Sequence, residues 1–417
     1  MNIYKLFKIS GLSAISTTIK TLVGIGITKL IAIYIGAEGL AFIGNLKNVL
    51  TSVTGLSTGG IDNGITKYIA TSKSELERNK IFHTSIFIGI TSSIVLSVIF
   101  FLSAEKITFF IFQNTQYIYL IKTFSFFIPF SALNIVINKF LNGKERYKKL
   151  VLINILASLI SLTLTSPLII YYHLAGAVLS FIITPLILFT VTIFIAYKDL
   201  PSLNLRNIKE YIISNYIKKL LSFSIITVTT TIITPLTLII VRNIIIQNLN
   251  IHSAGIWDAV NLISNNYFMF VSLTLSLFIL PEFSKANAKN KIIEIISTTI
   301  KTLLPFFILG LVIIFIFRDL IIKILLSDDF YEVSEYIGYQ LIGDGFKFIS
   351  WIFGMFLIAK AKTKYFITIQ LISAFKYSAL TFIFIYFWGN NGIYQAYLLN
   401  YLTHLPIVLY YFYKSNN

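Results

Sequence analysis

The sequence of 417 residues contains no cysteine and few charged residues, and each shortage excludes classes of function. Without cysteine there is no disulfide, no thiolate nucleophile and no cysteine-ligated metal. Charged residues make up only 12% of the chain, about half the share of a typical soluble domain. The histidines lie too far apart to form a helical metal-binding pair: His83, His173, His252 and His404.

Hydrophobic residues make up 56% of the chain, and its mean hydropathy is +0.81. Apolar segments of roughly 20 residues, long enough to cross a bilayer as helices, recur about twelve times. Composition and segment length together predict an all-α polytopic membrane protein. The expected spans are 9–35, 41–69, 81–103, 119–141, 150–170, 174–197, 220–246, 254–281, 299–317, 336–359, 365–388 and 392–413.

Lysine and arginine outside the spans are concentrated in alternate connections. The connections on one side contain only Lys106, Arg318 and Lys323, whereas the N-terminal segment and the other connections contain the great majority. Because basic residues gather on the cytoplasmic side of a membrane, both termini are predicted to be cytoplasmic.

The longest basic connection, 198–219, is partly amphipathic and is predicted to lie along the membrane surface as a cytoplasmic linker. It divides the chain into an N-terminal six-helix bundle, 1–197, and a C-terminal six-helix bundle, 220–417. A weak internal repeat supports this division, because residues 28–48 resemble residues 241–261. Repeated bundles of this kind are typical of transporters.

Charges inside the spans need an explanation, since a charge at the bilayer centre costs roughly 2.5–3.5 kcal/mol on insertion scales. Five cations are candidates for binding an anionic substrate: Lys20, Lys29, Lys47, Arg242 and Lys347. Three acids can pair with them: Asp62, Asp258 and Asp344. Of these, Asp62 and Asp344 are also candidates to carry a coupling proton. Purely structural pairing stays open as the alternative for every cation.

One stretch, YQLIGDGFKFISW, places polar side chains at the spacing of a single helical face. The residues on this face follow one another by 4, 3 and 4 positions: Gln340, Asp344, Lys347 and Trp351. Lipid would not accept such a face, so it is predicted to line a polar cavity. Asn261 and Asn265 form part of a similar stripe in an earlier span. Interhelical hydrogen bonds are the alternative role for these amides.

Several stretches resemble Wzx-type O-antigen flippases, which belong to the polysaccharide branch of the MATE-like exporter superfamily. They include GLSAISTTIKTLVGIGITKLIAIYIGAEGL, GIWDAVNLIS, LPEFSKA and YQLIGDGFKF, and they occur in matching order over essentially the whole chain. The resemblance implies a twelve-helix, MATE-like fold of two bundles around a central cavity. It also implies alternating-access transport of an undecaprenyl-pyrophosphate-linked oligosaccharide from the cytoplasmic to the periplasmic leaflet of the bacterial inner membrane.

With such a substrate, the five cations would bind the pyrophosphate or the sugar, and Lys20, Lys29, Arg242 and Lys347 fall within the resembling motifs. Lys47 stands where an arginine is expected in this family, and Asp258 also departs from the family pattern. Membrane lipids are the expected partners, with an O-antigen polymerase and a chain-length regulator as candidate protein partners and no nucleic acid. No cofactor is expected. Because no ATP-binding motif is present, energy is expected from a proton or Na⁺ gradient or from withdrawal of the product.

Two alternatives remain open at this point. A MATE-type multidrug or ion antiporter would share the fold, but cationic drugs would favour an acidic cavity. A membrane-embedded O-antigen polymerase or glycosyltransferase would be an enzyme, and such enzymes usually have sizeable extracytoplasmic loops. The sequence shows no nucleophile elbow, metal-ligand set or nucleotide-binding motif. A transporter, not an enzyme, is therefore the prediction.

Overall fold

The computed structural model describes residues 3–201, 214–221, 224–286 and 288–416, and within these ranges every regular element is a helix. The α-helices are α1 (Ile3–Tyr34), α2 (Gly36–Leu56), α3 (Asp62–Thr71), α4 (Glu75–Leu102), α5 (Ala104–Phe112), α6 (Ile118–Gly143), α7 (Tyr147–Ala196), α9 (Ser214–Leu221), α10 (Ser224–Asn248), α11 (Ile251–Thr274), α12 (Leu280–Lys285), α13 (Lys289–Ile316), α14 (Arg318–Leu325), α15 (Val333–Ala359), α16 (Thr363–Trp388) and α17 (Asn390–Asn416). The all-α prediction is confirmed.

The predicted spans lie largely in helices of the described residues, and eight helices there are long and apolar enough to cross a membrane. Large apolar side chains are exposed on their surfaces, among them Phe126 at 66% and Phe375 at 80%. Side chains of this kind suit a lipid environment. The fold is that of a polytopic membrane protein, while the number of crossings stays a prediction.

The predicted span 41–69 is divided into α2 and α3 by a pair of glycines. Gly59 and Gly60 have φ values of +67° and +75°, which side chains other than hydrogen rarely allow. A Cβ atom at Gly60 would also lie 3.0 Å from the Cα atom of Ser224. The two glycines therefore allow a sharp break between α2 and α3 and a close approach to the first residue of α10.

The two predicted spans 150–170 and 174–197 form one long element, α7, with a kink between them. His173 has non-helical angles there, with φ of 48° and ψ of −127°. Its ring Nδ1 lies 3.3 Å from the backbone carbonyl oxygen of Tyr34 at the end of α1. The kink separates the two apolar stretches that the sequence predicted as separate spans.

The helices pack into two compact units. The N-terminal unit comprises Met1–Tyr34 and Asn45–Pro235, and the C-terminal unit comprises Ile35–Gly44 and Leu236–Asn417. Of the three boundaries between the units, one falls between α1 and α2, and the other two fall inside α2 and inside α10. The greater part of the predicted linker, 202–213, lies outside the described residues, so its surface location stays a prediction.

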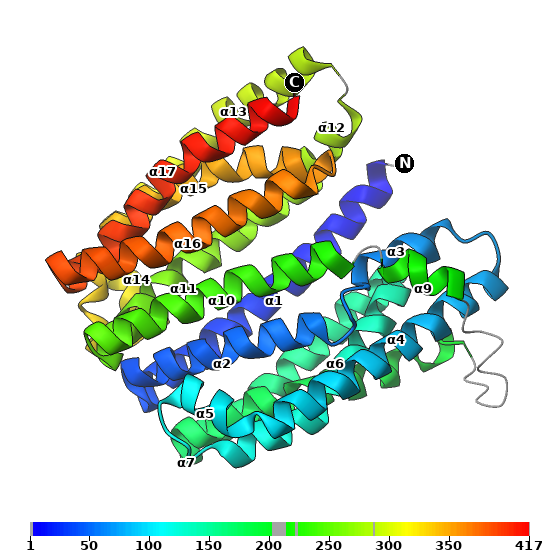
Figure 1. Ribbon diagram of the computed structural model, residues 1–417, viewed down its shortest axis with the longest axis horizontal. Helices are drawn as coiled ribbons and strands as arrows, with labels where there is room; N and C mark the ends of the chain where they lie inside the picture. Colours follow the sequence, from blue (N-terminus) through cyan, green and yellow to red (C-terminus); the bar gives the residue numbers. More distant parts are fainter. Residues whose placement is uncertain (1–2, 202–213, 222–223, 287, 417) are drawn as a thin grey trace. The chain divides into compact units, whose positions relative to one another are not determined.

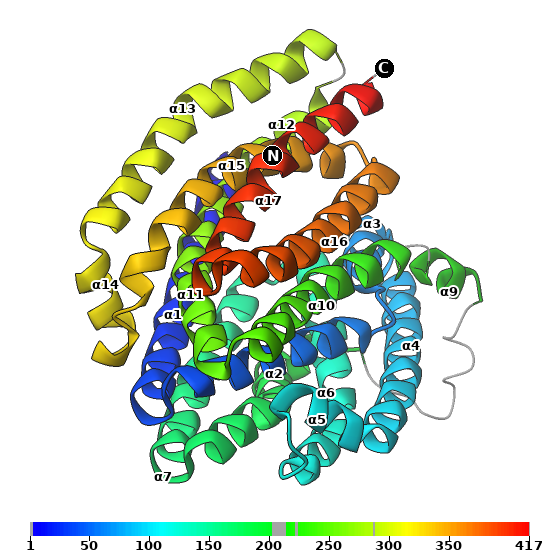
Figure 2. The same ribbon diagram turned by 60° about the vertical axis from the view of Figure 1, so that its left-hand side comes forward.

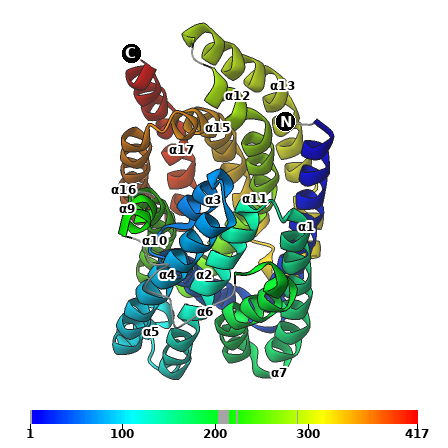
Figure 3. The ribbon, with the colours of Figure 1, turned by 90° about the vertical axis from the view of Figure 1, so that its right-hand side faces the viewer.

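In the N-terminal unit, α1 packs beside α7, and α6 packs against both α4 and α7 (Figure 3). Isoleucine, phenylalanine and leucine side chains fill the core between α3, α4, α6 and α7. Phe82 and Phe140 meet at its centre, with ring centroids 4.6 Å apart. This packing positions one face of α6 and one face of α7 toward α2.

In the C-terminal unit, α15, α16 and α17 lie side by side (Figures 1 and 2). Stacked aromatic rings hold these helices to their neighbours. Tyr336 of α15 stacks on Tyr394 of α17 at 4.3 Å, and Phe348 of α15 stacks on Phe307 of α13 at 4.5 Å. These contacts fix the rotation of α15 and therefore the direction of its polar face.

The short helix α9 packs against α3 and α4 in the N-terminal unit. Its Tyr216 hydroxyl donates a hydrogen bond of 3.4 Å to Oε1 of Glu77. Burial, and then the negative charge of Glu77, raise the pKa of Tyr216 above its usual value. The phenol therefore remains a neutral donor at ordinary pH.

Candidate functional site

The polar face of α15 centres on Asp344, whose side chain is completely buried. Three hydroxyl groups from neighbouring helices donate to its carboxylate. Ser264 of α11 lies 2.6 Å from Oδ2, Tyr397 of α17 lies 2.5 Å from Oδ1, and Tyr267 of α11 also donates to Oδ2. These hydrogen bonds offset the desolvation cost of the buried carboxylate.

Lys347 lies one turn further along the same face of α15. Its Nζ is 3.9 Å from Oδ1 of Asp344 and donates to the Tyr397 hydroxyl at 3.4 Å. The ammonium also lies 4.1 Å from the ring centroid of Phe268 and 5.5 Å from that of Tyr401. Its side chain stays 23% exposed, so the ammonium rests on an aromatic platform beside a loosely associated carboxylate.

Arg242 of α10 and Asp258 of α11 form a tight, bidentate ion pair. The guanidinium Nε donates to Oδ2 and Nη2 donates to Oδ1, both at 2.6 Å. Arg242 is buried, and its guanidinium lies 5.3 Å from the Trp257 ring centroid. The structure therefore pairs Arg242 with Asp258, one of the three acids that the sequence offered as partners.

A glycine of α2 makes room for this ion pair. A Cβ atom at Gly44 would lie 2.6 Å from Nη2 of Arg242 and 2.7 Å from Oδ2 of Asp258. Any larger residue would press on both partners at once. The first part of α2 thus packs directly on the Arg242–Asp258 pair within the C-terminal unit.

A layer of aromatic side chains connects the two ion pairs. Trp257, beside Arg242, donates its indole N–H to the hydroxyl of Tyr377 at 3.2 Å. The Tyr377 ring meets the Tyr397 ring edge-on at 5.9 Å, and Tyr397 donates to Asp344. The sequence-predicted residues of α10, α11 and α15 are therefore joined into one continuous network.

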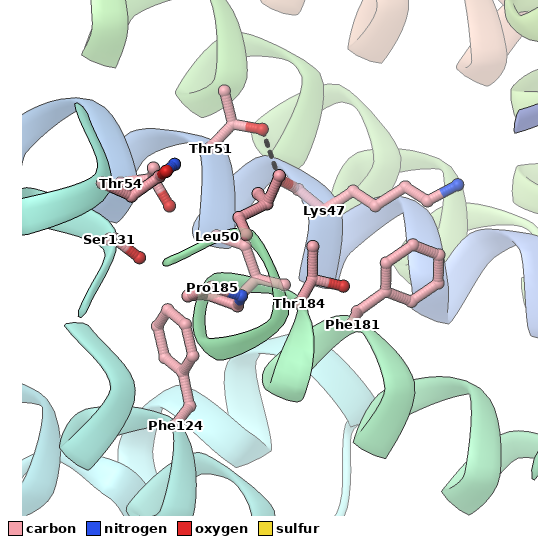
Figure 4. Close-up of a pocket in the computed structure, with 11 residues that line it drawn as sticks. Lys47, Leu50, Thr51, Thr54, Phe124, Ser131, Phe181, Thr184 and Pro185 are labelled. Carbon is pink, nitrogen blue, oxygen red and sulfur yellow. Dashed lines mark hydrogen bonds between the residues drawn. The ribbon is translucent and has the colours of Figure 1, made fainter. Parts of the chain in front are cut away.

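Lys47 of α2 lines a cavity of about 450 Å³ in the N-terminal unit (Figure 4). Its ammonium lies 4.7 Å from the ring centroid of Phe181 on α7. The polar groups around the cavity come from three helices, α2, α6 and α7. They include Lys47, Thr51, Ser131, Asn134 and Thr184.

The remaining predicted charges lie elsewhere in the N-terminal unit. On α1, Lys20 is exposed, whereas Lys29, nine residues further on, is half-buried. Asp62 begins α3 and accepts a hydrogen bond from the Thr58 hydroxyl, and Lys139 of α6 is within electrostatic reach of it. The interaction partners of Asp62 therefore differ from those of Asp258 and Asp344.

The predicted cavity-lining amides have different surroundings. Gln340 is buried, and its amide has no hydrogen-bond partner among the described residues. Asn261 donates to the backbone oxygen of Trp257 at 2.9 Å, and Asn265 is exposed. Trp351 is half-buried, with its ring 5.5 Å from that of Phe268. Among the described residues, no group of three His, Cys, Asp or Glu side chains is arranged to hold a metal ion.

Sequence reasoning missed the hydroxyl groups that satisfy Asp344. Ser264 and Tyr267 follow Asp258 on α11, but their positions are also ordinary for interhelical packing. Tyr397 comes from a different helix, and no spacing rule connects it with α15. The polar wall around Lys47, including Ser131 and Thr184, was missed for the same reason.

The fold is that of a class of multi-pass membrane transporters. An inward-facing multidrug resistance MATE family transporter of the MOP superfamily superposes with a TM-score of 0.77 at 11% identity, covering 95% of this chain and 94% of that chain. The lipid II flippase MurJ, in its inward closed conformation, gives 0.72 at 17% identity and covers 95% and 86%. The predicted MATE-like fold class is confirmed.

Residues 7–287 match the family described as polysaccharide biosynthesis protein, and the chain belongs to this family. Among curated proteins it is similar to the lipid III flippases of Escherichia coli (strain K12) and Shigella flexneri. Each is 26% identical over 415 residues, which cover 96% of this chain and 97% of the relative. The resemblance to flippases predicted from the motifs is confirmed.

Proposed function

We propose that this protein is a flippase that moves an undecaprenyl-pyrophosphate-linked oligosaccharide, an O-antigen repeat unit, across the bacterial inner membrane. Similarity to lipid III flippases over nearly the full length of both chains supports this function. The likeness of the fold to transporters, including a lipid II flippase, supports transport rather than enzymatic catalysis.

The observation that carries the proposal is the environment of Lys347. Three hydroxyl groups already donate to Asp344, so the lysine does not have to neutralise that carboxylate alone. Its partly exposed ammonium, on the Phe268 and Tyr401 rings, can therefore accept an anionic partner. A pyrophosphate diester carries such a charge and binds lysine strongly where water is scarce.

In this proposal the N-terminal unit offers positive charge of its own to an anionic substrate, at Lys20, Lys29 and Lys47, and the polyprenyl tail stays in the lipid. Arg242 acts mainly through its pair with Asp258. The oligosaccharide moves from the cytoplasmic to the periplasmic leaflet by alternating access, driven by a proton or Na⁺ gradient or by withdrawal of the product. Both termini are cytoplasmic, and an O-antigen polymerase and a chain-length regulator are the protein partners.

A MATE-type multidrug antiporter is the second candidate, and the fold likeness to MATE transporters favours it. Its substrates would be cationic, however, and Lys47 and Lys347 would repel them. The two functions therefore differ in the sign of the cargo charge.

The test is leaflet exchange in proteoliposomes. Purified protein is reconstituted with a fluorescent undecaprenyl-pyrophosphoryl oligosaccharide, and a membrane-impermeant reductant bleaches the probe in the outer leaflet. Full bleaching is expected with the protein, and about half is expected in protein-free vesicles, because there only the outer leaflet reacts. Bleaching that stays at the protein-free level, together with uptake of ethidium, would establish the antiporter instead.

A further inference from the structure

The cavity beside Lys47 has a wall that offers hydrogen-bond donors and acceptors to a ligand. At about 450 Å³ it falls within the usual range of small-ligand sites, roughly 300–1,000 Å³. Figure 4 shows side chains of α2, α6 and α7 around it. Its chemistry indicates which ligand it fits.

The donors of the wall include the amide of Asn134. Its Oδ1 accepts two hydrogen bonds, from Nδ2 of Asn138 at 2.9 Å and from the Thr192 hydroxyl at 2.7 Å. These two donors fix the orientation of the amide, so its NH₂ group points away from them. Asn134 lines the cavity, and this NH₂ group is the donor it can offer.

The hydroxyl groups supply the acceptors. Thr51 donates to the backbone oxygen of Lys47 at 2.7 Å, and Thr184 donates to that of Ser180 at 2.9 Å. Each hydroxyl oxygen keeps its lone pairs for another donor. The Ser131 hydroxyl is buried and turned toward the cavity (Figure 4), and it has no hydrogen-bond partner in the described part of the chain.

The rest of the cavity is apolar and aromatic. Phe124, Phe181 and Pro185 contribute flat or rigid apolar surfaces, and the Lys47 ammonium lies over the Phe181 ring. None of the described lining residues is acidic. The cavity therefore combines mixed donors and acceptors, flat apolar faces and one positive charge.

We propose that this cavity is a saccharide subsite, which holds one pyranose ring of the lipid-linked oligosaccharide during transport. The inference rests on the proposed flippase function. A pyranose has hydroxyl groups that both donate and accept, and it has an apolar C–H face that packs on aromatic rings. Lys47 adds a preference for a sugar that bears a carboxylate or lies next to the pyrophosphate.

Other occupants fit the same surface less well. A polyprenyl or acyl chain would leave the Ser131 hydroxyl and the Asn134 NH₂ group without partners, which is unfavourable for buried polar groups. A cationic drug would meet Lys47 at the cavity wall. A bare pyrophosphate would use Lys47 but would gain nothing from Phe124 and Phe181.

The natural absence of cysteine makes a direct test straightforward, because a single introduced thiol is the only one in the chain. The variant Thr184→Cys places that thiol in the cavity, and Thr54→Cys is a second variant in the same cavity. Gln116→Cys, in the exposed connection between α5 and α6, is the control. Each purified variant is modified in detergent with a maleimide, and the modification rate is measured.

Two probes are compared, undecaprenyl-pyrophosphoryl-N-acetylglucosamine and sugar-free undecaprenyl pyrophosphate. At about ten times its dissociation constant, the sugar-bearing lipid should slow modification of both cavity thiols by roughly tenfold. The sugar-free lipid should change those rates less than about twofold. Neither lipid should change the rate at Gln116→Cys.

Each other result overturns the subsite. Equal slowing by both lipids would place the shared pyrophosphate or prenyl chain in the cavity. No slowing by either lipid would refute the subsite alone if wild-type protein still exchanges the sugar-bearing lipid between leaflets. If the wild-type protein also fails to exchange the lipid, the flippase function is refuted as well. Failure of the subsite and failure of the flippase function are therefore distinguishable.

Discussion

Two ion pairs of the C-terminal unit, connected by a layer of aromatic rings, are built in opposite ways. Arg242 and Asp258 satisfy each other directly through two hydrogen bonds of 2.6 Å. Lys347 lies 3.9 Å from Asp344, whose oxygens are occupied by hydroxyl groups such as that of Tyr397. In the first pair each charge cancels the other, whereas in the second the carboxylate is satisfied largely without its lysine.

This difference separates two roles for charge inside a membrane protein. A bidentate arginine–carboxylate pair has little electrostatic attraction left for a third group, so we expect Arg242 and Asp258 mainly to fix the packing of α10 on α11. Lys347 is 23% exposed and does not have to neutralise Asp344 alone, so it is suited to an anionic cargo that arrives and leaves. The following variants test this division.

The largest effect is expected from Asp258→Asn, because it leaves the buried Arg242 guanidinium without its counter-charge. Breaking a buried pair by removing one partner costs about 3–5 kcal/mol of unfolding free energy. Thermal unfolding of the purified protein in detergent should show the loss.

The matched control removes both charges of that pair. The double variant Arg242→Met with Asp258→Leu should recover most of the stability, since replacing both partners with apolar residues is often neutral. If this variant is stable and still exchanges lipid between leaflets, Arg242 is structural. Loss of exchange in a stable double variant would instead make Arg242 a substrate contact.

A smaller loss is expected from Tyr397→Phe. Removing a hydrogen bond to a charged group costs about 1.5–3 kcal/mol, and Asp344 would then draw Lys347 closer. Unfolding free energy and lipid exchange should therefore both fall. Tyr386→Phe, at a tyrosine that is 81% exposed on α16, is the control and should change neither.

Lys347→Met should lower the rate of lipid exchange about tenfold, which corresponds to roughly 1.4 kcal/mol of lost charge-assisted binding. Unfolding free energy should change little, because Asp344 keeps its three hydroxyl donors. Lys347→Arg should keep most of the activity, since the charge is kept. The control is Lys122→Met. Lys122 also lies over an aromatic ring, that of Phe101, but it is exposed, so this variant should not change lipid exchange. Equal losses at both lysines would contradict a specific role for Lys347.

The smallest effect is expected at the surface contact between α9 and α4. Tyr216→Phe removes one hydrogen bond to Glu77 and should cost less than about 1 kcal/mol. Because the pKa of Tyr216 is raised, the phenol should stay protonated from about pH 6 to 9. The contribution of its hydrogen bond to the unfolding free energy should therefore persist over this range and be lost only in more alkaline solution. A difference between wild type and variant that already changes near neutral pH would refute this contact.

Sequence periodicity was sufficient to place Asp344 and Lys347 on one helical face, because helical spacing is local. The sequence also offered the pairing of Arg242 with a carboxylate as an alternative. Asp258 provides that carboxylate from the next helix, after a short connection. Hydropathy marked the boundary within α7, where the kink at His173 separates two apolar stretches.

The partners of these charges depend on how the helices rotate and slide against one another, and a single sequence does not specify either. Nothing near Tyr397 in the sequence indicates that its hydroxyl reaches Asp344 from another helix. The hydroxyl groups of Ser131 and Thr184 are likewise ordinary in membrane helices until packing brings them beside Lys47.

The contact at Gly44 has a practical consequence for any survey of variants. The side chain of glycine is a single hydrogen atom, and it leaves the space that the guanidinium of Arg242 and the carboxylate of Asp258 need to stay paired. A methyl group there would wedge the two side chains apart without altering either of them. Loss of function at this uncharged position would then report on electrostatics, and Gly44→Ala should be grouped with the variants of Arg242 and Asp258.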